Sequence, residues 1–172
     1  MDNKTSPFLS NTIVIRYSTL GFCLLEILVS MLIVAFAMLG IAKLQLNAIR
    51  DVQSAHYATK AAMLTSQMSA QITANKDALD SYQLAFKQTP TLSVDCEKTA
   101  CSNIQLANFD LILWQNNINK ALPSGAGEII TSTSIANIIV RWDEDKSGST
   151  GLNCPKQSSL DMECSKISRL VL

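Results

Sequence analysis

The chain has 172 residues, with 14 basic and 14 acidic side chains, and 48% of its residues are hydrophobic. This length suits one domain of ordinary size with a little extra. Because the charges balance, the composition favours neither nucleic acid nor an acidic substrate as a partner.

The most apolar segment lies near the N-terminus, at residues 22–42, where Glu26 is the only formal charge. A helix of this length spans about 31 Å, roughly the thickness of a bilayer core. A cleavable secretory signal would have a shorter apolar region ending in small residues of the A-x-A kind, and no such site follows Ala42. We therefore predict a single transmembrane helix. Lys4 and Arg16 precede it, which favours a cytoplasmic N-terminus and an exported C-terminal part.

The helical pattern continues beyond the apolar segment, since no Pro or Gly interrupts residues 41–74. We predict one helix from about Phe22 to about Ala78, in which residues 43–78 form an amphipathic half. The second half can pack against a globular head, whereas the first half needs lipid or other copies of itself. The predicted apolar stripe recurs at steps of three or four, at Leu44, Ala48, Val52, Ala55, Ala58, Ala61, Leu64, Met68 and Ile72.

Residues 79–172 are predicted to form a small α+β head. Residues 79–103 contain Pro90 and are predicted to be a loop. Asn108 is the predicted cap of a helix that ends at Pro123, and strands are predicted at 128–132, 136–143 and 170–172. This order of elements predicts an α+β fold with an antiparallel sheet. The residues expected to share the buried face of the helix are Leu111, Trp114, Ile118, Ala121 and Leu122.

Four of the five cysteines lie in the predicted head, as two close pairs. Disulfides between them would agree with export to an oxidising compartment. Pairing Cys96 with Cys101 and Cys154 with Cys164 closes the shortest loops and is favoured here, although the sequence alone leaves the other two connectivities open. A zinc site is disfavoured because the spacing of the second pair does not fit a ligand knuckle. Cys23, inside the apolar segment, is interpreted as a small buried hydrophobe.

Few segments of the head suggest chemistry. Residues 143–148 begin like an EF-hand calcium loop, but the twelfth position is Cys154 and not Glu, so a solvated turn is favoured and no metal site is predicted. His56 is the only histidine and is expected to be an exposed helix residue. No phosphate-binding loop and no hydrolase motif is present. We therefore predict no enzymatic activity, no cofactor and no small-molecule substrate.

Glu26 requires an explanation, because a carboxylate inside a membrane needs a partner, a proton or an exit to the interface. A cut between Gly21 and Phe22 would create an α-amino group four residues before Glu26, and the free N–H groups of the first helical turn would point the same way. The hexapeptide GFCLLE at residues 21–26, followed by the apolar run, resembles the processing site of type IV prepilins. Cys23 stands where that family usually has Thr.

This resemblance implies that residues 1–21 are a leader removed by a prepilin peptidase. It also implies that Phe22 becomes the N-methylated first residue and that Glu26 assists assembly. Three further blocks, at residues 34–45, at 110–115 leading to 122–127, and at 139–143, are similar to segments of the PilV-type minor pilins.

The resemblance therefore implies a type IV pilin-like fold and a minor pilin that takes part in initiating and assembling pili within a membrane complex. Its expected partners are other minor pilins, the major pilin and the prepilin peptidase. Its expected place is the inner membrane, with a periplasmic head, and the pilus fibre or its tip.

Two alternatives remain at this stage. A pseudopilin of a type II secretion system would share the processing site, but the head is large for the small minor member of that group, and the blocks around Trp114 and Trp142 favour the pilus. A single-pass anchored periplasmic domain, with a binding or enzymatic role, would make Gly21 and Glu26 coincidences. That reading is disfavoured because an uncompensated Glu in a membrane segment is rare.

Overall fold

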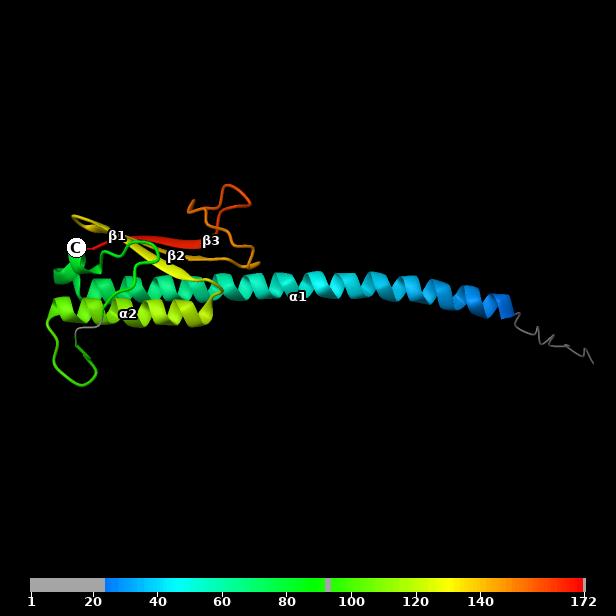
Figure 1. Cartoon of the computed structure of the whole chain (residues 1–172), viewed down its shortest axis with the longest axis horizontal. Coiled ribbons are helices and arrows are strands. Elements are labelled where there is room, and N and C mark those ends of the chain that lie inside the picture. The colour runs from blue at the N-terminus through cyan, green and yellow to red at the C-terminus, as the bar shows by residue number, and fades with distance from the viewer. Residues whose placement is uncertain (1–23, 92–93, 172) are drawn as a thin grey trace, which may run out of the picture. The chain divides into compact units, whose positions relative to one another are not determined.

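A computed structural model describes residues 24–91 and 94–171 of the chain (Figure 1). The elements are a long helix α1 (Leu24–Ala74), a 3₁₀ helix η1 (Lys76–Tyr82), a second helix α2 (Asn103–Ala121), and three strands, β1 (Ala126–Ser132), β2 (Ile135–Trp142) and β3 (Glu163–Leu170). The chain divides into two compact units, residues 1–45 and residues 46–172.

Helix α1 is one uninterrupted helix of 51 residues. It ends at Ala74, earlier than the predicted end near Ala78. Asn75 has non-helical dihedral angles (φ −120°, ψ 45°), and its side-chain amide donates hydrogen bonds to the Tyr82 hydroxyl and to the carbonyl of Asn103. The chain then tightens into η1. The helix therefore ends next to a residue whose side chain ties this end of α1 to η1 and to the start of α2.

Only the C-terminal part of the predicted apolar stripe is buried. Ala61, Met68 and Ile72 are fully buried, whereas Leu44 and Val52 are 71% and 70% exposed. The buried face also includes two polar residues that the hydrophobic pattern omits, Thr65 and Ser69. The Thr65 hydroxyl can be buried because it donates to the Ala61 carbonyl at 2.6 Å.

The segment after α1 is more ordered than predicted. Residues 79–103 were expected to be a loop, yet η1 extends to Tyr82, and Leu84 forms an isolated antiparallel bridge with Ile129 of β1. The side chains of Leu79, Tyr82 and Leu84 are buried in the core. The loop prediction was wrong here because polar neighbours in the sequence hid three core residues.

Helix α2 begins five residues before the predicted cap at Asn108. Ser102 is the actual N-cap, and it forms a capping box with Gln105. The Ser102 hydroxyl accepts from the main-chain N–H of Gln105, and the side-chain carbonyl of Gln105 accepts from the main-chain N–H of Ser102. The predicted buried face is confirmed at Leu111, Trp114 and Ile118.

The three strands form one antiparallel sheet in the order β1-β2-β3. The first two predicted strands are present with slightly shifted ends. The third prediction, residues 170–172, was wrong: β3 ends at Leu170 and is built from the mixed polar sequence before it. Such an edge strand lacks the hydrophobic alternation on which the prediction relied.

The α+β prediction is confirmed, and the core lies between the helices and the sheet (Figure 1). The Trp114 indole on α2 donates to the Leu64 carbonyl of α1 at 2.9 Å, and the hydroxyl oxygens of Thr65 on α1 and Ser165 on β3 lie 3.3 Å apart, within hydrogen-bond distance. Gly127 in β1 lies so close to the Trp114 ring that a Cβ atom there would overlap it. This glycine lets the sheet approach the largest core side chain.

Candidate functional site

The N-terminal half of α1 is the first candidate site. Within residues 24–91 and 94–171, α1 is the one helix long and apolar enough to cross a membrane. Its apolar side chains are exposed, for example Leu24 at 75% and Phe36 at 67%. A continuous apolar surface of this extent is unfavourable in water, so lipid or other protein must cover it.

Glu26 lies in the first turn of this helix. The free N–H groups of that turn carry partial positive charge, which favours a carboxylate at this position. The Ser30 hydroxyl donates to the main-chain carbonyl of Glu26 at 2.7 Å and is thereby satisfied within the helix. Among the described residues no side chain pairs with the Glu26 carboxylate. Gly21 and Phe22, the predicted cleavage and methylation residues, lie outside the described part of the chain, as does Cys23.

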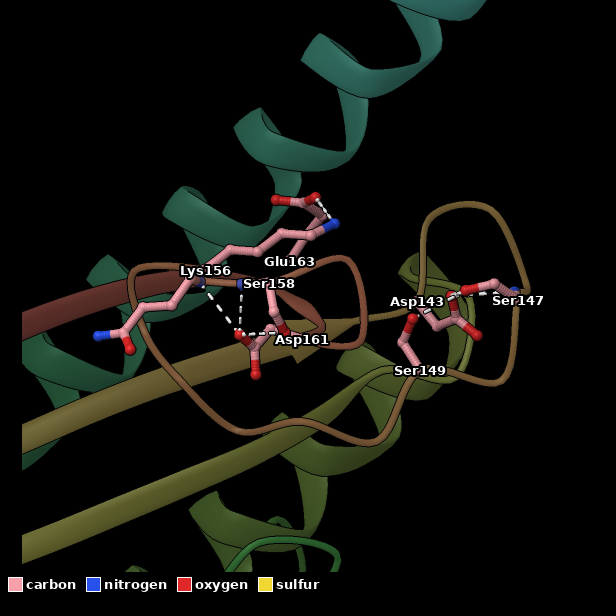
Figure 2. Close-up of polar contacts among 8 residues, drawn as sticks. Asp143, Ser147, Ser149, Lys156, Ser158, Asp161 and Glu163 are labelled. Atoms are coloured by element: carbon pink, nitrogen blue, oxygen red, sulfur yellow. Dashed lines mark hydrogen bonds and ion pairs between the residues drawn. The ribbon is translucent and has the colours of Figure 1, made fainter.

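A second candidate is the C-terminal loop that the Cys154–Cys164 disulfide closes. The two Cα atoms are 5.9 Å apart. Asp161 lies inside this loop and is only 2% exposed. Its carboxylate accepts a hydrogen bond from the main-chain N–H of Ser158 at 2.8 Å (Figure 2). It also accepts from the main-chain N–H of Gln157 at 3.1 Å and from the Asn153 side-chain amide at 3.1 Å.

Asp161 is held in its charged form. Burial by itself would raise the pKa of the Asp161 carboxyl, but the hydrogen bonds from Asn153, Gln157 and Ser158 outweigh burial and lower the pKa to about 2. Lys156 and Glu163 form an ion pair of 2.6 Å at the surface of the same loop (Figure 2). The result is a small, internally braced element of the head. Asp161 was not predicted from the sequence, where its only signal is its place in a short segment bounded by cysteines.

The loop that resembled the start of a calcium site is a turn organised by Asp143. Its Oδ1 accepts from the main-chain N–H and the hydroxyl of Ser147, both at 3.1 Å (Figure 2). Its Oδ2 accepts from the main-chain N–H of Gly148 at 2.8 Å. Burial opposes ionisation, but these hydrogen bonds outweigh it and lower the pKa of Asp143. The carboxylate that would be the first calcium ligand is thus occupied by donors of its own turn.

The other disulfide, between Cys96 and Cys101, has its Cα atoms 5.5 Å apart. It comes directly before Ser102, the N-cap of α2. The bond therefore fixes the chain where it enters α2. In the structure both disulfides join cysteines within one close pair.

A cluster of buried polar side chains joins the end of α1, η1 and α2. The Tyr82 hydroxyl donates to Asp110 Oδ2 at 2.7 Å, and Gln71 donates to Asp110 Oδ1 at 3.2 Å. Burial raises the pKa of Asp110, opposed by the Tyr82 hydrogen bond, and burial also raises the pKa of Tyr82. This cluster was not predicted either. Its hydrogen bonds run between α1, η1 and α2, so the cluster joins these elements of the fold.

His56 is an exposed residue of α1, as expected. Together these features describe an apolar helix with one carboxylate in its first turn, followed by a disulfide-braced head. An exposed apolar helix of this length fits a membrane-anchored protein.

Comparison with known proteins supports that class. Residues 43–112 match the family model described as Tt1218-like, type IV pilin Tt1218. The long apolar N-terminal helix and the head with a three-stranded antiparallel sheet are consistent with the type IV pilin fold. The match supports a type IV pilin family for this chain, as the resemblance at residues 21–26 implied. Neither the curated proteins nor the solved structures contain a significant match.

Proposed function

We propose that this protein is a minor pilin of the PilV type. It joins other minor pilins in a membrane complex that initiates assembly of type IV pili, and it enters the fibre near the tip beside the major pilin. The type IV pilin family match and the fold support the general role, and the three PilV-like sequence blocks support the finer one. Its role is structural and not enzymatic.

The observation that carries this proposal is the place of Glu26. Insertion scales put the cost of a charged residue such as Asp at about 2.5–3.5 kcal/mol at mid-bilayer, and the cost is lower near the edge. An α-amino group at Phe22, created when a prepilin peptidase cuts after Gly21, would offset it. If that amine belongs to a neighbouring subunit, the pair also fixes how far one helix is displaced along the other. Glu26 would then be an assembly residue.

The proposed topology follows from the same features. The leader is cytoplasmic, α1 crosses the inner membrane through its apolar half, and the head is periplasmic. The two disulfides fit a periplasmic head, because cysteines form stable disulfides in the oxidising periplasm and remain thiols in the reducing cytosol.

Processing is tested by the intact mass of protein extracted from membranes. The mature chain should begin at Phe22 and carry one added methyl group. A chain that retains Met1, or that begins beyond Ala42, would rule out the prepilin reading.

The assembly role is tested with Glu26→Ala and a matched control, Asp51→Ala, which removes an exposed carboxylate from the same helix beyond the apolar segment. Glu26→Ala should leave cleavage and membrane insertion intact, because the uncharged segment is the better anchor, yet it should reduce co-purification with partner pilins and reduce piliation. Asp51→Ala should change neither. Normal co-purification and piliation of the Glu26 variant would contradict the proposed role.

Mass spectrometry of sheared pili separates the pilus from the secretion system. A PilV-type minor pilin should be found in sheared pili in small amounts relative to the major pilin. Recovery only with components of a secretion system would favour the pseudopilin alternative.

A further inference from the structure

The head carries a cleft of about 320 Å³ that none of the features above uses. It lies between the segment after η1, one face of α2 and the turn that leads into β1. Its lining includes Lys87, Gln88, Ile112, Gln115, Asn119 and Ser124. Its volume is near the lower end of the range for small-molecule sites, so it suits a ligand of about the size of one sugar unit.

Hydrogen bonds fix the orientation of the amide side chains in this cleft. Gln115 Oε1 accepts from the main-chain N–H of Gly127 at 3.0 Å, so the Gln115 nitrogen must be a donor, and it donates to Asn119 Oδ1 at 3.2 Å. The Asn119 nitrogen is therefore left as a donor at the end of this relay. Gln88 is oriented in the same sense, because its Oε1 accepts from the Ala85 N–H at 2.9 Å. Three amides thus use their oxygens within the protein and keep N–H groups for a ligand.

The charge of the cleft agrees with this donor bias. Lys87 is the one charged residue that lines it, and no carboxylate does. Among the described residues the Lys87 ammonium forms no ion pair, and its recorded contact is with the ring of Phe86, 5.4 Å away. Ile112, half-buried on α2, supplies an apolar surface beside the amides.

Two residues of the cleft have unusual backbone conformations. Among the described residues three non-glycine positions have positive φ, and two of these, Lys87 (60°) and Ser124 (49°), line this cleft from separate segments. Left-handed conformations at non-glycine residues are uncommon, and they concentrate where the fold holds a functional surface in place. Here both residues lie in the lining of one cleft.

We propose that this cleft binds a sugar acid, a small ligand that carries one carboxylate beside several hydroxyl groups. The Lys87 ammonium pairs with the carboxylate, the amide N–H groups of Asn119, Gln115 and Gln88 donate to hydroxyl and ring oxygens, and Ile112 contacts the C–H face. The ligand is bound and not converted. This site is independent of Glu26 and of the assembly role.

The test uses the full chain in a detergent without a sugar headgroup, with sodium glucuronate as the probe and binding followed by ligand-detected saturation-transfer NMR. Glucuronate should bind saturably, and its methyl ester and glucose should bind about tenfold more weakly, because a charge-assisted hydrogen bond is lost. Equal binding of glucuronate and glucose would overturn the carboxylate assignment. Absence of saturable glucuronate binding would overturn the proposal.

Variants place the ligand in the cleft. Lys87→Gln and Asn119→Leu should each raise the dissociation constant for glucuronate by about tenfold or more, in line with the loss of one such contact. The matched controls are Lys166→Gln on β3 and Asn117→Leu on α2, two exposed positions that do not line the cleft. These should leave the dissociation constant unchanged. An equal loss in the controls, or no loss in the two cleft variants, would show that glucuronate does not bind here.

Discussion

The head contains two buried carboxylates whose pKa values are displaced in opposite directions. Asp161 in the C-terminal disulfide loop is 2% exposed and its pKa is lowered to about 2, whereas Asp110 on α2 is 8% exposed and its pKa is raised. Burial opposes the charge in both cases. The number and kind of hydrogen-bond donors therefore decide the outcome.

Asp161 accepts from main-chain N–H groups of Gln157 and Ser158, which the closed loop holds in place, and from side chains as well. Asp110 accepts from two side chains, Gln71 and Tyr82, and has no main-chain donor among its recorded partners. A short covalently closed loop can thus supply enough fixed donors to keep a buried charge, while a packed interface between helices supplies fewer. Four predictions test this contrast.

Removal of the Cys154–Cys164 disulfide should have the largest effect on the free energy of unfolding. Cys154→Ser combined with Cys164→Ser should lower the free energy of unfolding by about 3 kcal/mol, because the unfolded chain is no longer cross-linked and has more conformational entropy. The matched control, Cys96→Ser with Cys101→Ser, opens a shorter loop and should cost about 2 kcal/mol. Denaturant unfolding measures both. A larger cost for the shorter loop would show that closure entropy does not explain the stability.

Asp110→Leu should have the second-largest effect on the free energy of unfolding. It leaves the Tyr82 hydroxyl and the Gln71 amide without their buried acceptor, at a cost of about 1–3 kcal/mol in the free energy of unfolding. Asp110→Asn, which keeps an acceptor for one of these donors, is the control and should cost less. If Leu were tolerated as well as Asn, the cluster would not contribute to joining η1 and α2.

Asp161→Asn should loosen the C-terminal loop more than the head as a whole. The folded pKa of about 2 lies below the ordinary value of 3.8, so the folded state binds fewer protons between these values. The stabilisation by Asp161 is therefore complete above about pH 4 and is lost as the pH falls towards 2. The protection factors of the Gln157 and Ser158 amides, which are exchange rates corrected for the intrinsic effect of pH, should fall over this range in the wild type. In Asp161→Asn these protection factors should be low and nearly independent of pH.

The smallest effect should be the contribution of Asp110 to the pH dependence of stability, which is opposite in sign to that of Asp161. Because its folded pKa is raised above 3.8, the folded state binds more protons, and stability falls as the pH rises from 3.8 through the folded pKa. Asp110→Asn should remove this fall, which unfolding experiments across that range would detect. An unchanged pH profile in the variant would mean that another group is responsible.

Much of the fold follows from local sequence patterns. The long helix, the buried face of α2 and the first two strands were predicted because periodic apolar residues report which face is covered. The family resemblance depended on the short segment around Glu26. The predicted disulfide pairs, which loop length favoured, are those present in the structure.

The sequence by itself determined that an apolar helix carries one carboxylate in its first turn and leads into an α+β head, because hydrophobicity and its period are properties of neighbouring residues. Only the tertiary structure decided where α1 ends, that Leu84 pairs with Ile129, and that Asp110 and Asp161 are buried among different donors. The same holds for the cleft, whose walls come from three separate segments. Such features depend on residues distant in the chain, and a local pattern carries no information about which of them will meet.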